Sequence, residues 1–212
     1  MNNSRYLDII SRIKGKNIII VGDIMLDVYY WGDVHRISQE APVPIVQITK
    51  ENVRAGGAGN VAKNVSGLTA NPILIGMLGE DSYGNTLLEQ FKDQSISTDG
   101  IFRVTDRRTT VKTRVIAQNQ QMIRFDKEYN EFVSKSVEQQ VVNALNKYIT
   151  NAHGIILADY GKGILTPTII SEIIGISQKH DIPVYVDPKT NDFTHFKNVH
   201  MIKPNFHEFQ SV

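Results

Sequence analysis

Residues 17–23 read NIIIVGD, an apolar, β-branched run that ends in glycine and aspartate. This pattern is typical of a strand buried on both faces, as in a parallel sheet. Similar runs occur at residues 72–77, 154–158, 183–186 and 199–202. Stretches with helix start signals lie before and between them, at residues 4–13, 59–68, 83–94, 134–150 and 167–180. Strands alternating with helices predict right-handed βαβ units and an α/β fold with a mainly parallel sheet.

Two segments break this alternation. Residues 28–49 and 109–126 alternate apolar and polar side chains, which is typical of antiparallel strands with one solvated face. We expect them to form a small β lid over one end of the parallel sheet. The chain has no internal repeat and no low-complexity linker, so we expect residues 1–212 to belong to one domain.

The composition limits the classes of function. The 212 residues carry a formal net charge of +1, which argues against a nucleic-acid-binding surface over the whole molecule. The absence of cysteine excludes disulfides, thiol nucleophiles and Cys-based zinc sites. No apolar run approaches the roughly 18 residues of a membrane span, and no signal peptide is recognisable. We therefore expect a cytoplasmic protein without nucleic-acid or membrane partners.

Polar side chains follow four of the predicted strands where each strand ends. Carboxyl ends of parallel strands share one edge of the sheet, where ligands of such folds bind. Several carboxylates, lysines and an asparagine therefore converge on one rim, which predicts a site for an anionic ligand. Helix capping remains the alternative for any single one of them. The residues are Asp23 with Asp27, Asp159 with Lys162, Asp187 with Lys189, and Lys203 with Asn205.

A glycine cluster, RAGGAGN at residues 54–60, leads into a predicted helix. Glycine lets the backbone approach a ligand closely, and Asn60 adds a side chain that donates and accepts. The cluster matches neither GxGxxG nor GxxxxGK[ST], so a tight turn remains the alternative. At the next such junction, we expect Asp81 or Ser82 to cap a helix rather than bind a ligand.

Cations are placed regularly in the second lid segment. Lys112 and Arg114 are two residues apart on a predicted strand, so both point to one face, and Arg124 lies on the next strand. Arginine and lysine bind phosphate oxygens well, so a basic face over the rim would suit a phosphorylated substrate. A solvated charged face is the alternative.

Six segments resemble the ribokinase-like (PfkB) carbohydrate kinases. GGAGN and the GxxGxD stretch at residues 76–81 mark the broad family, whereas ISQEAPVP and NQQMIRFD are closer to its branch acting on D-glycero-D-manno-heptose 7-phosphate. The resemblance implies a Rossmann-like three-layer α/β/α domain with a β lid. The segments are VGDIMLDVYYWGDVHRISQEAPVPIV (21–46), GGAGNVAKNV (56–65), TTVKTRVIAQNQQMIRFD (109–126), LADYGKGILT (157–166), VDPKTNDF (186–193) and IKPNFHEF (202–209).

The resemblance also implies a reaction and roles for residues. The reaction is transfer of the ATP γ-phosphoryl group, with Mg²⁺, to the C1 hydroxyl of the heptose phosphate. Asp23 and Asp27 would hold sugar hydroxyls, with Gly56, Gly57 and Asn60 closing that side. Lys112 and Arg114 would bind the existing phosphate, and Asp159, Lys162 and Lys189 would line the rim. Asn205 and Glu208 would form the family's NxxE element, which supports the nucleotide and the metal. Lid strands in such kinases often pair between subunits, which suggests a homodimer through the lid.

One family motif does not occur in this sequence. DTxGAGD would supply the anion hole and the aspartate that deprotonates the acceptor hydroxyl, so we assign no catalytic base. We expect residues 1–212 to be the N-terminal two-thirds of a kinase domain, and the chain alone to be a very poor kinase. Two alternatives remain open: a family member acting on ribose, fructose or a nucleoside, and a sugar-phosphate-binding or dimerisation module without catalysis.

Overall fold

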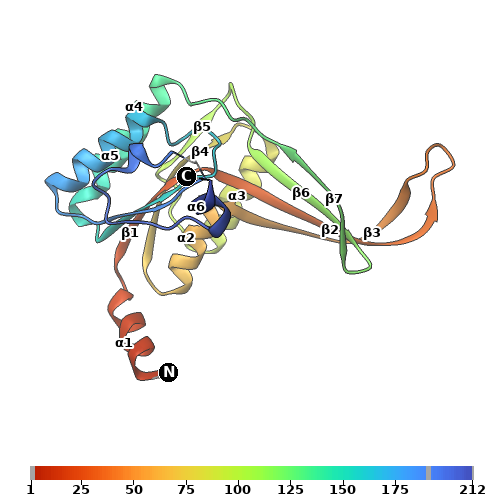
Figure 1. The fold of residues 1–212 in the computed structure, drawn as a ribbon, viewed down its shortest axis with the longest axis horizontal. Coiled ribbons are helices and arrows are strands. Elements are labelled where there is room, and N and C mark those ends of the chain that lie inside the picture. Colours follow the sequence, from red (N-terminus) through yellow and green to blue (C-terminus); the bar gives the residue numbers. More distant parts are fainter. Residues whose placement is uncertain (1–2, 190–191, 212) are drawn as a thin grey trace.

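The computed structural model describes residues 3–189 and 192–211, so Thr190 and Asn191 of the VDPKTNDF segment, and Val212, lie outside the described residues. Figure 1 shows one sheet flanked by helices and a second sheet that extends away from it. The helices are α1 (Asn3–Ile13), α2 (Ala58–Gly67), α3 (Ser82–Asp93), α4 (Lys135–Tyr148), α5 (Pro167–Lys179) and α6 (Phe206–Gln210), with 3₁₀ turns at Ile149–Asn151 and Thr194–Phe196. The strands are β1 (Asn17–Gly22), β2 (Ile24–Ile37), β3 (Pro44–Gly57), β4 (Asn71–Gly79), β5 (Ile101–Val104), β6 (Thr110–Ala117), β7 (Gln120–Lys127), β8 (Gly154–Ala158), β9 (Val184–Asp187) and β10 (Met201–Ile202).

The main sheet has six strands in the order β10-β9-β8-β1-β4-β5, and all of its pairs are parallel. The predicted α/β fold with a mainly parallel sheet is confirmed. β1 lies in the middle, with Ile19 opposite Ile73 on β4 and Ile155 on β8. The edge strand β5 was not predicted from the sequence. It is four residues long and half-buried throughout, so it lacks the apolar run that marks the central strands.

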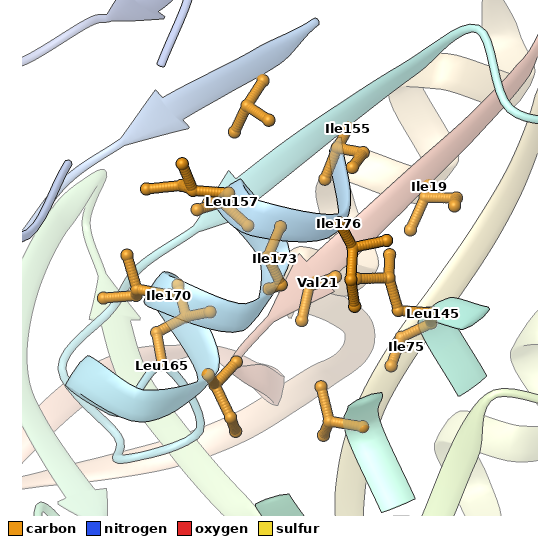
Figure 2. Close-up of a cluster of buried hydrophobic side chains, with 14 of the residues drawn as sticks. Ile19, Val21, Ile75, Leu145, Ile155, Leu157, Leu165, Ile170, Ile173 and Ile176 are labelled. Atoms are coloured by element: carbon orange, nitrogen blue, oxygen red, sulfur yellow. The ribbon is translucent and has the colours of Figure 1, made fainter. Parts of the chain in front are cut away.

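The strand β1 explains why the fold has three layers. Ile19 and Val21 point to one face of the sheet and pack in a cluster with α4 and α5, whereas Ile20 points to the other face and packs with α2 and α3. All three side chains are fully buried. Figure 2 shows side chains of α5, including Ile173 and Ile176, packed against those of β1 and β8. Helices on both faces require a strand whose central positions are all apolar, as residues 18–21 of β1 are.

Capping side chains precede α3, α4 and α5, close to the positions at which the sequence predicts these helices to begin. Asp81 accepts a hydrogen bond from the Gly84 N–H at 2.8 Å and caps α3, so the capping interpretation of this residue is confirmed. Ser134 caps α4, and Thr166 caps α5 with a proline in the first turn. These caps supply acceptors for N–H groups that have no partner inside the helix.

The lid is a sheet of four strands in the order β3-β2-β6-β7. The pairs β2–β3 and β6–β7 are antiparallel, as expected, but β2 and β6 run parallel, so the prediction of antiparallel strands is wrong for that pair. β2 begins at Ile24, directly after the main-sheet strand, and β3 runs on to Gly57. The first lid segment is thus longer at both ends than the predicted 28–49, and half of the glycine cluster belongs to a strand.

The outer part of the β2–β3 hairpin extends beyond the other two lid strands. β6 pairs with β2 only as far as Gly32, so beyond this point the two strands of the hairpin pair only with each other. Figure 1 shows this hairpin projecting from the molecule. Its outer part, residues 33–48, exposes Ile37, Val43 and Ile48, and we call it the lid arm. Within the described part of the chain, no helix is both long and apolar enough to cross a bilayer.

Candidate active site

A cleft of about 550 Å³ lies between the lid and the carboxyl ends of the main-sheet strands. Eleven of the twelve residues to which the family resemblance gives roles line it; the exception is Asp23. Their convergence follows from the parallel sheet and from the lid strands that continue out of it. The eleven are Asp27, Gly56, Gly57, Asn60, Lys112, Arg114, Asp159, Lys162, Lys189, Asn205 and Glu208.

Asp23 lies apart from the other predicted site residues. Its side chain is buried, and its carboxylate accepts hydrogen bonds from the backbone N–H groups of Tyr160, Lys162 and Ile164 at 3.0, 3.0 and 3.2 Å. Burial raises the pKa of Asp23 above its ordinary value, and the three N–H groups counteract this by favouring the ionised form. The carboxylate therefore fixes the rim loop, residues 159–164. It is not among the residues that line the cleft, so the structure does not bring it together with the other eleven.

Asp27 lies on β2 at the bottom of the lid and faces the cleft. Its Oδ1 accepts a hydrogen bond from Nη1 of Arg114 on β6 at 2.6 Å, and both side chains remain about one-fifth exposed. The Arg114 guanidinium also lies 5.1 Å above the ring of Tyr29, which in turn stacks on Trp31 at 5.5 Å. Tyr29 and Trp31 thus pack against each other within the lid. Arg114 is held on two sides, and it in turn orients Asp27.

The glycine cluster closes the cleft beside Asp27. A Cβ atom on Gly56 would lie 2.3 Å from Oδ2 of Asp27, so only glycine lets this carboxylate sit where it does. Gly57 has a φ of 57°, a left-handed conformation, and ends the strand just before α2 begins. Asn60 lies in the first turn of α2 and is exposed toward the cleft. These contacts explain why glycines stand at both positions.

The other lid cations form a network with two carboxylates. Arg124 donates to both oxygens of Asp126, at 2.9 and 2.6 Å. Lys112 Nζ lies 3.5 Å from Asp126 and 3.5 Å from Glu128. Lys162, on the rim loop, completes the network with a 2.9 Å ion pair to Glu128. The network therefore connects the lid to the main domain.

Asp126 and Glu128 were not assigned roles from the sequence. They could have been found from the spacing: Arg124 and Asp126 alternate on one face of a strand, and Glu128 continues this alternation directly after the strand ends. The hydrogen bond from Arg124 holds the pKa of Asp126 below its ordinary value. Burial alone would raise the pKa of Glu128, but the hydrogen bond and charge of Lys162 and the charge of Lys112 outweigh it and lower the pKa. Both groups are thus kept ionised at neutral pH.

The opposite side of the cleft is the rim formed by the ends of β8, β9 and β10. Asp159 accepts from the Gly161 N–H at 2.9 Å, and Lys203 pairs with Asp187 at 3.1 Å. Tyr160, half-buried between them, has its pKa raised, first by burial and then by neighbouring carboxylates including Asp187. The phenol therefore remains a neutral hydrogen-bond donor at the edge of the cleft.

Asn205 and Glu208 form a capping box around α6. The Asn205 side chain accepts from the Glu208 N–H at 2.9 Å, and the Glu208 carboxylate accepts from the Asn205 N–H at 2.8 Å. The other Glu208 oxygen lies 3.6 Å from Lys189 Nζ. The capping alternative is thus observed for this pair, while both residues also line the cleft.

The described residues do not form a metal site of their own. Across residues 3–189 and 192–211 no three His, Cys, Asp or Glu side chains are grouped so that they could hold an ion. Mg²⁺ in phosphoryl-transfer sites usually takes one or two carboxylates and completes its octahedron with water and substrate phosphates. Glu208 can supply one such carboxylate, so the described residues fit an ion that arrives with a nucleotide.

The sheet, the lid and the charged cleft between them define the class of the protein: an open α/β domain with a lid and a charged cleft at the carboxyl ends of its strands, where such folds bind small molecules. The chain belongs to the pfkB family of carbohydrate kinases, whose sequence profile matches residues 16–212.

Two bacterial relatives share the name bifunctional protein HldE. The chain is 39% identical over all 212 of its residues to the bifunctional protein HldE of Trichlorobacter lovleyi, and covers 43% of that protein. It is 38% identical over 195 residues to the bifunctional protein HldE of Helicobacter pylori strain P12, covering 92% of this chain and 42% of that one. The chain thus spans less than half the length of these relatives.

Solved structures share the fold. The ribokinase of Arabidopsis thaliana, complexed with ribose and ATP, superimposes with a TM-score of 0.68 at 16% identity, covering 93% of this chain and 62% of that one. The tetrameric inhibited form of phosphofructokinase-2 from Escherichia coli gives a TM-score of 0.67 at 17% identity, covering 93% of this chain and 63% of that one. The ribokinase-like fold with a β lid is therefore confirmed.

Proposed function

We propose that this chain is the sugar-phosphate-binding part of an ATP-dependent kinase acting on D-glycero-D-manno-heptose 7-phosphate. The observation that carries the proposal is the meeting of Asp27 with lid and rim cations in one cleft. A carboxylate that accepts from hydroxyls beside cations that bind phosphate suits a sugar that already carries a phosphate group. Membership of the pfkB family of carbohydrate kinases supports a sugar as the acceptor, and the resemblance of the ISQEAPVP and NQQMIRFD segments supports the heptose in particular.

In the proposed reaction the C1 hydroxyl oxygen of the sugar attacks the γ-phosphorus of ATP. The bond from this phosphorus to the bridging oxygen breaks, ADP leaves, and the hydroxyl proton passes to a base. Asp27 and Asn60 orient the sugar, with Gly56 and Gly57 as the wall beside it, and Asp159, Lys162 and Lys189 line the opposite rim. Asn205 and Glu208 support the nucleotide phosphates. Bound Mg²⁺ would supply charge neutralisation on those phosphates, with Glu208 as its protein ligand.

The chain alone should bind better than it catalyses. Its sequence does not contain the DTxGAGD motif that the family resemblance implies for the base and the anion hole. Loss of a base typically lowers a rate about 10²–10⁴-fold, and loss of an anion-hole donor lowers it a further ~10²–10³-fold. We therefore propose a very low rate of turnover for these 212 residues, in the cytoplasm where ATP and sugar phosphates are available.

Calorimetry with a panel of sugars tests the proposal. We expect heptose 7-phosphate to bind more tightly than unphosphorylated heptose, ribose or fructose. Tight binding of ribose or fructose with no binding of the heptose phosphate would instead favour another sugar kinase of the family. Coupled measurement of ADP release then separates the kinase from a binding module: fusing this chain to the remainder of a relative should raise turnover, whereas a pure binding module would stay inactive.

We also propose that two copies of the chain associate through their lids. The lid arm pairs only with itself and exposes Ile37, Val43 and Ile48, although an isolated two-stranded ribbon is at best marginally stable. A second lid packed on it would cover these side chains. Sedimentation velocity should show a dimer for the wild type and a monomer for Ile48→Lys. Lys14→Glu should remain dimeric, because Lys14 directly follows α1, which lies on the opposite side of the molecule from the arm (Figure 1).

A further inference from the structure

A single carboxylate connects two lysines that come from different parts of the molecule. Glu128 follows the last lid strand, β7, and is about one-quarter exposed. Its Oε1 lies 2.9 Å from Nζ of Lys162 on the rim loop, and its Oε2 lies 3.5 Å from Nζ of Lys112 on β6. Because each carboxylate oxygen contacts one lysine, the two ammonium groups are held close to each other, although Lys112 and Lys162 are 50 positions apart in the sequence.

The two lysines face the cleft and Glu128 stands behind them. Lys112 and Lys162 both line the cleft, whereas Glu128 does not. Their side chains are 15% and 13% exposed, so each ammonium group is largely desolvated and is presented in a narrow range of directions. A desolvated cation keeps a strong interaction with an anion that enters the cleft.

The position of Lys162 is fixed from several sides. Its backbone N–H donates to Asp23 at 3.0 Å, and its carbonyl accepts from Nη2 of Arg107 at 3.2 Å. Its ammonium group also donates to Oδ1 of Asn130 at 2.8 Å, beside Glu128 in sequence. Lys112 has fewer restraints, because its two ion-pair contacts are both at 3.5 Å. The Glu128 carboxylate therefore places the more mobile lysine relative to the fixed one.

The remaining cations of the cleft have a carboxylate each. Arg114 pairs with Asp27, Arg124 pairs with Asp126 through two hydrogen bonds, and Lys203 pairs with Asp187. These cations are already engaged in close charge-assisted contacts. Lys112 and Lys162 share Glu128, and the second carboxylate near Lys112, Asp126, already accepts two hydrogen bonds from Arg124. This network therefore has three cations for two carboxylates, and its excess positive charge is available to an additional anion at the two lysines.

We propose that Glu128 is a positioning residue that sets Lys112 and Lys162 as a pair for the phosphate group of the substrate. This rests on the proposed function in that the phosphate belongs to a phosphorylated sugar. It narrows that proposal, because Arg114 then orients Asp27 and the sugar, while the lysine pair distinguishes a phosphorylated sugar from an unphosphorylated one. A phosphate monoester presents three terminal oxygens, and two ammonium groups can donate to different ones.

The variant Glu128→Gln distinguishes a positioning role from simple charge balance, because the two predict opposite changes in the affinity for a phosphorylated ligand. Removing a negative charge near the cleft would, by electrostatics alone, tighten the binding of an anion. The glutamine amide, however, has only one acceptor oxygen, and its NH₂ group would face the second ammonium. If Glu128 acts by positioning, the pair separates and phosphate binding weakens. Glu131→Gln is the matched control, because it removes the same charge from an exposed side chain three residues away.

Calorimetry with two ligands measures the effect. For Glu128→Gln we expect the affinity for heptose 7-phosphate to fall at least about tenfold, as for loss of a charge-assisted contact, and the affinity for unphosphorylated heptose to change less than about twofold. Glu131→Gln should leave both affinities unchanged. Equal loss for both ligands, or tighter binding of the heptose phosphate, would overturn the proposal.

A second measurement tests the positioning role of Glu128 with inorganic phosphate in place of the sugar. The extent of chemical acetylation of each lysine can be measured by mass spectrometry with and without inorganic phosphate. In the wild type, phosphate should reduce the acetylation of both Lys112 and Lys162. In Glu128→Gln, it should no longer reduce the acetylation of both. Glu128→Asp, which keeps the charge but is shorter, provides the same readout if the glutamine variant does not fold. If heptose phosphate does not bind the wild type but phosphate still reduces the acetylation of both lysines, the proposed function is wrong and the proposal of a phosphate-binding lysine pair is retained. If protection is identical in all variants, Glu128 does not position the lysines.

Discussion

Asp27 Oδ1 lies 2.6 Å from Nη1 of Arg114, and this contact joins β2 to β6 at the point where the lid leaves the main sheet. The arginine is also held by the ring of Tyr29, so the carboxylate is presented to the cleft in one orientation. A pre-positioned carboxylate binds sugar hydroxyls without a further loss of side-chain freedom. Asp27 is therefore the residue whose replacement should most directly report on sugar binding.

Asp27→Asn should weaken the binding of phosphorylated and unphosphorylated heptose by the same factor. A hydrogen bond to a charged group contributes about 1.5–3 kcal/mol, which corresponds to roughly 10–150-fold in affinity. Calorimetry with both sugars measures this, and Asp33→Asn on the exposed lid arm is the control. Unchanged affinity in Asp27→Asn would remove this residue from the site.

The convergence of the site residues could be predicted, because the carboxyl ends of parallel strands lie at one edge of the sheet regardless of the conformation of the loops. The direction of the Asp23 side chain could not. It depends on three N–H groups that lie more than 130 residues further along the chain. The parallel pairing of β2 with β6 was also beyond the sequence pattern, since alternation identifies a strand and its faces but not its partner. Glu128 was accessible from its spacing with Arg124 and Asp126.

Asp23→Ala should destabilise the fold strongly. It leaves three backbone N–H groups of the rim loop without their acceptor, and each buried unsatisfied group costs about 1–3 kcal/mol. Because the loop can relax partly, we expect a loss of about 3–5 kcal/mol in the free energy of unfolding, measured by urea titration at neutral pH. Asp8→Asn, on the exposed face of α1, should change it by less than about 0.5 kcal/mol. Equal urea midpoints for the two variants would contradict the assigned role.

The two neighbouring glycines should respond differently to alanine. In Gly56→Ala the new Cβ would lie 2.3 Å from Oδ2 of Asp27, so the carboxylate must move and sugar binding should fall at least about tenfold. In Gly57→Ala the Cβ would lie 2.2 Å from the backbone oxygen of Asp23, at a φ of 57°. Backbone clash and strain should there cost about 2 kcal/mol or more in stability.

Calorimetry and urea titration on the same preparations separate the two effects. Gly67→Ala is the control, because no heavy atom lies within 4 Å of its new Cβ and alanine suits a helix better than glycine. A Gly56→Ala variant that binds sugar like the wild type would show that the Asp27 carboxylate has more freedom than its contacts indicate.

The ion pairs of the lid should make stability depend on pH in the acid range. The folded-state pKa of Asp126 is lowered by the hydrogen bond from Arg124, so the unfolded chain takes up a proton at a higher pH than the folded chain does. The stabilisation by Asp126 is therefore fully present above its ordinary value of 3.8 and is lost as the pH falls through the lower folded value. Asp23 acts in the opposite direction, because its raised pKa reduces stability as the pH rises through the ordinary value of 3.8.

Comparing the wild type with Asp126→Asn at each pH cancels the contribution of Asp23, since that residue is present in both proteins. Urea titrations should give a difference of about 0.5–1 kcal/mol at pH 7, reduced by salt because Arg124 is 41% exposed. The difference should shrink as the pH falls below 3.8, because the Asp126 carboxylate becomes protonated in both the folded and the unfolded chain. A difference that stays constant from pH 7 to about pH 3 would mean that Asp126 stabilises the lid through its shape and not through its charge.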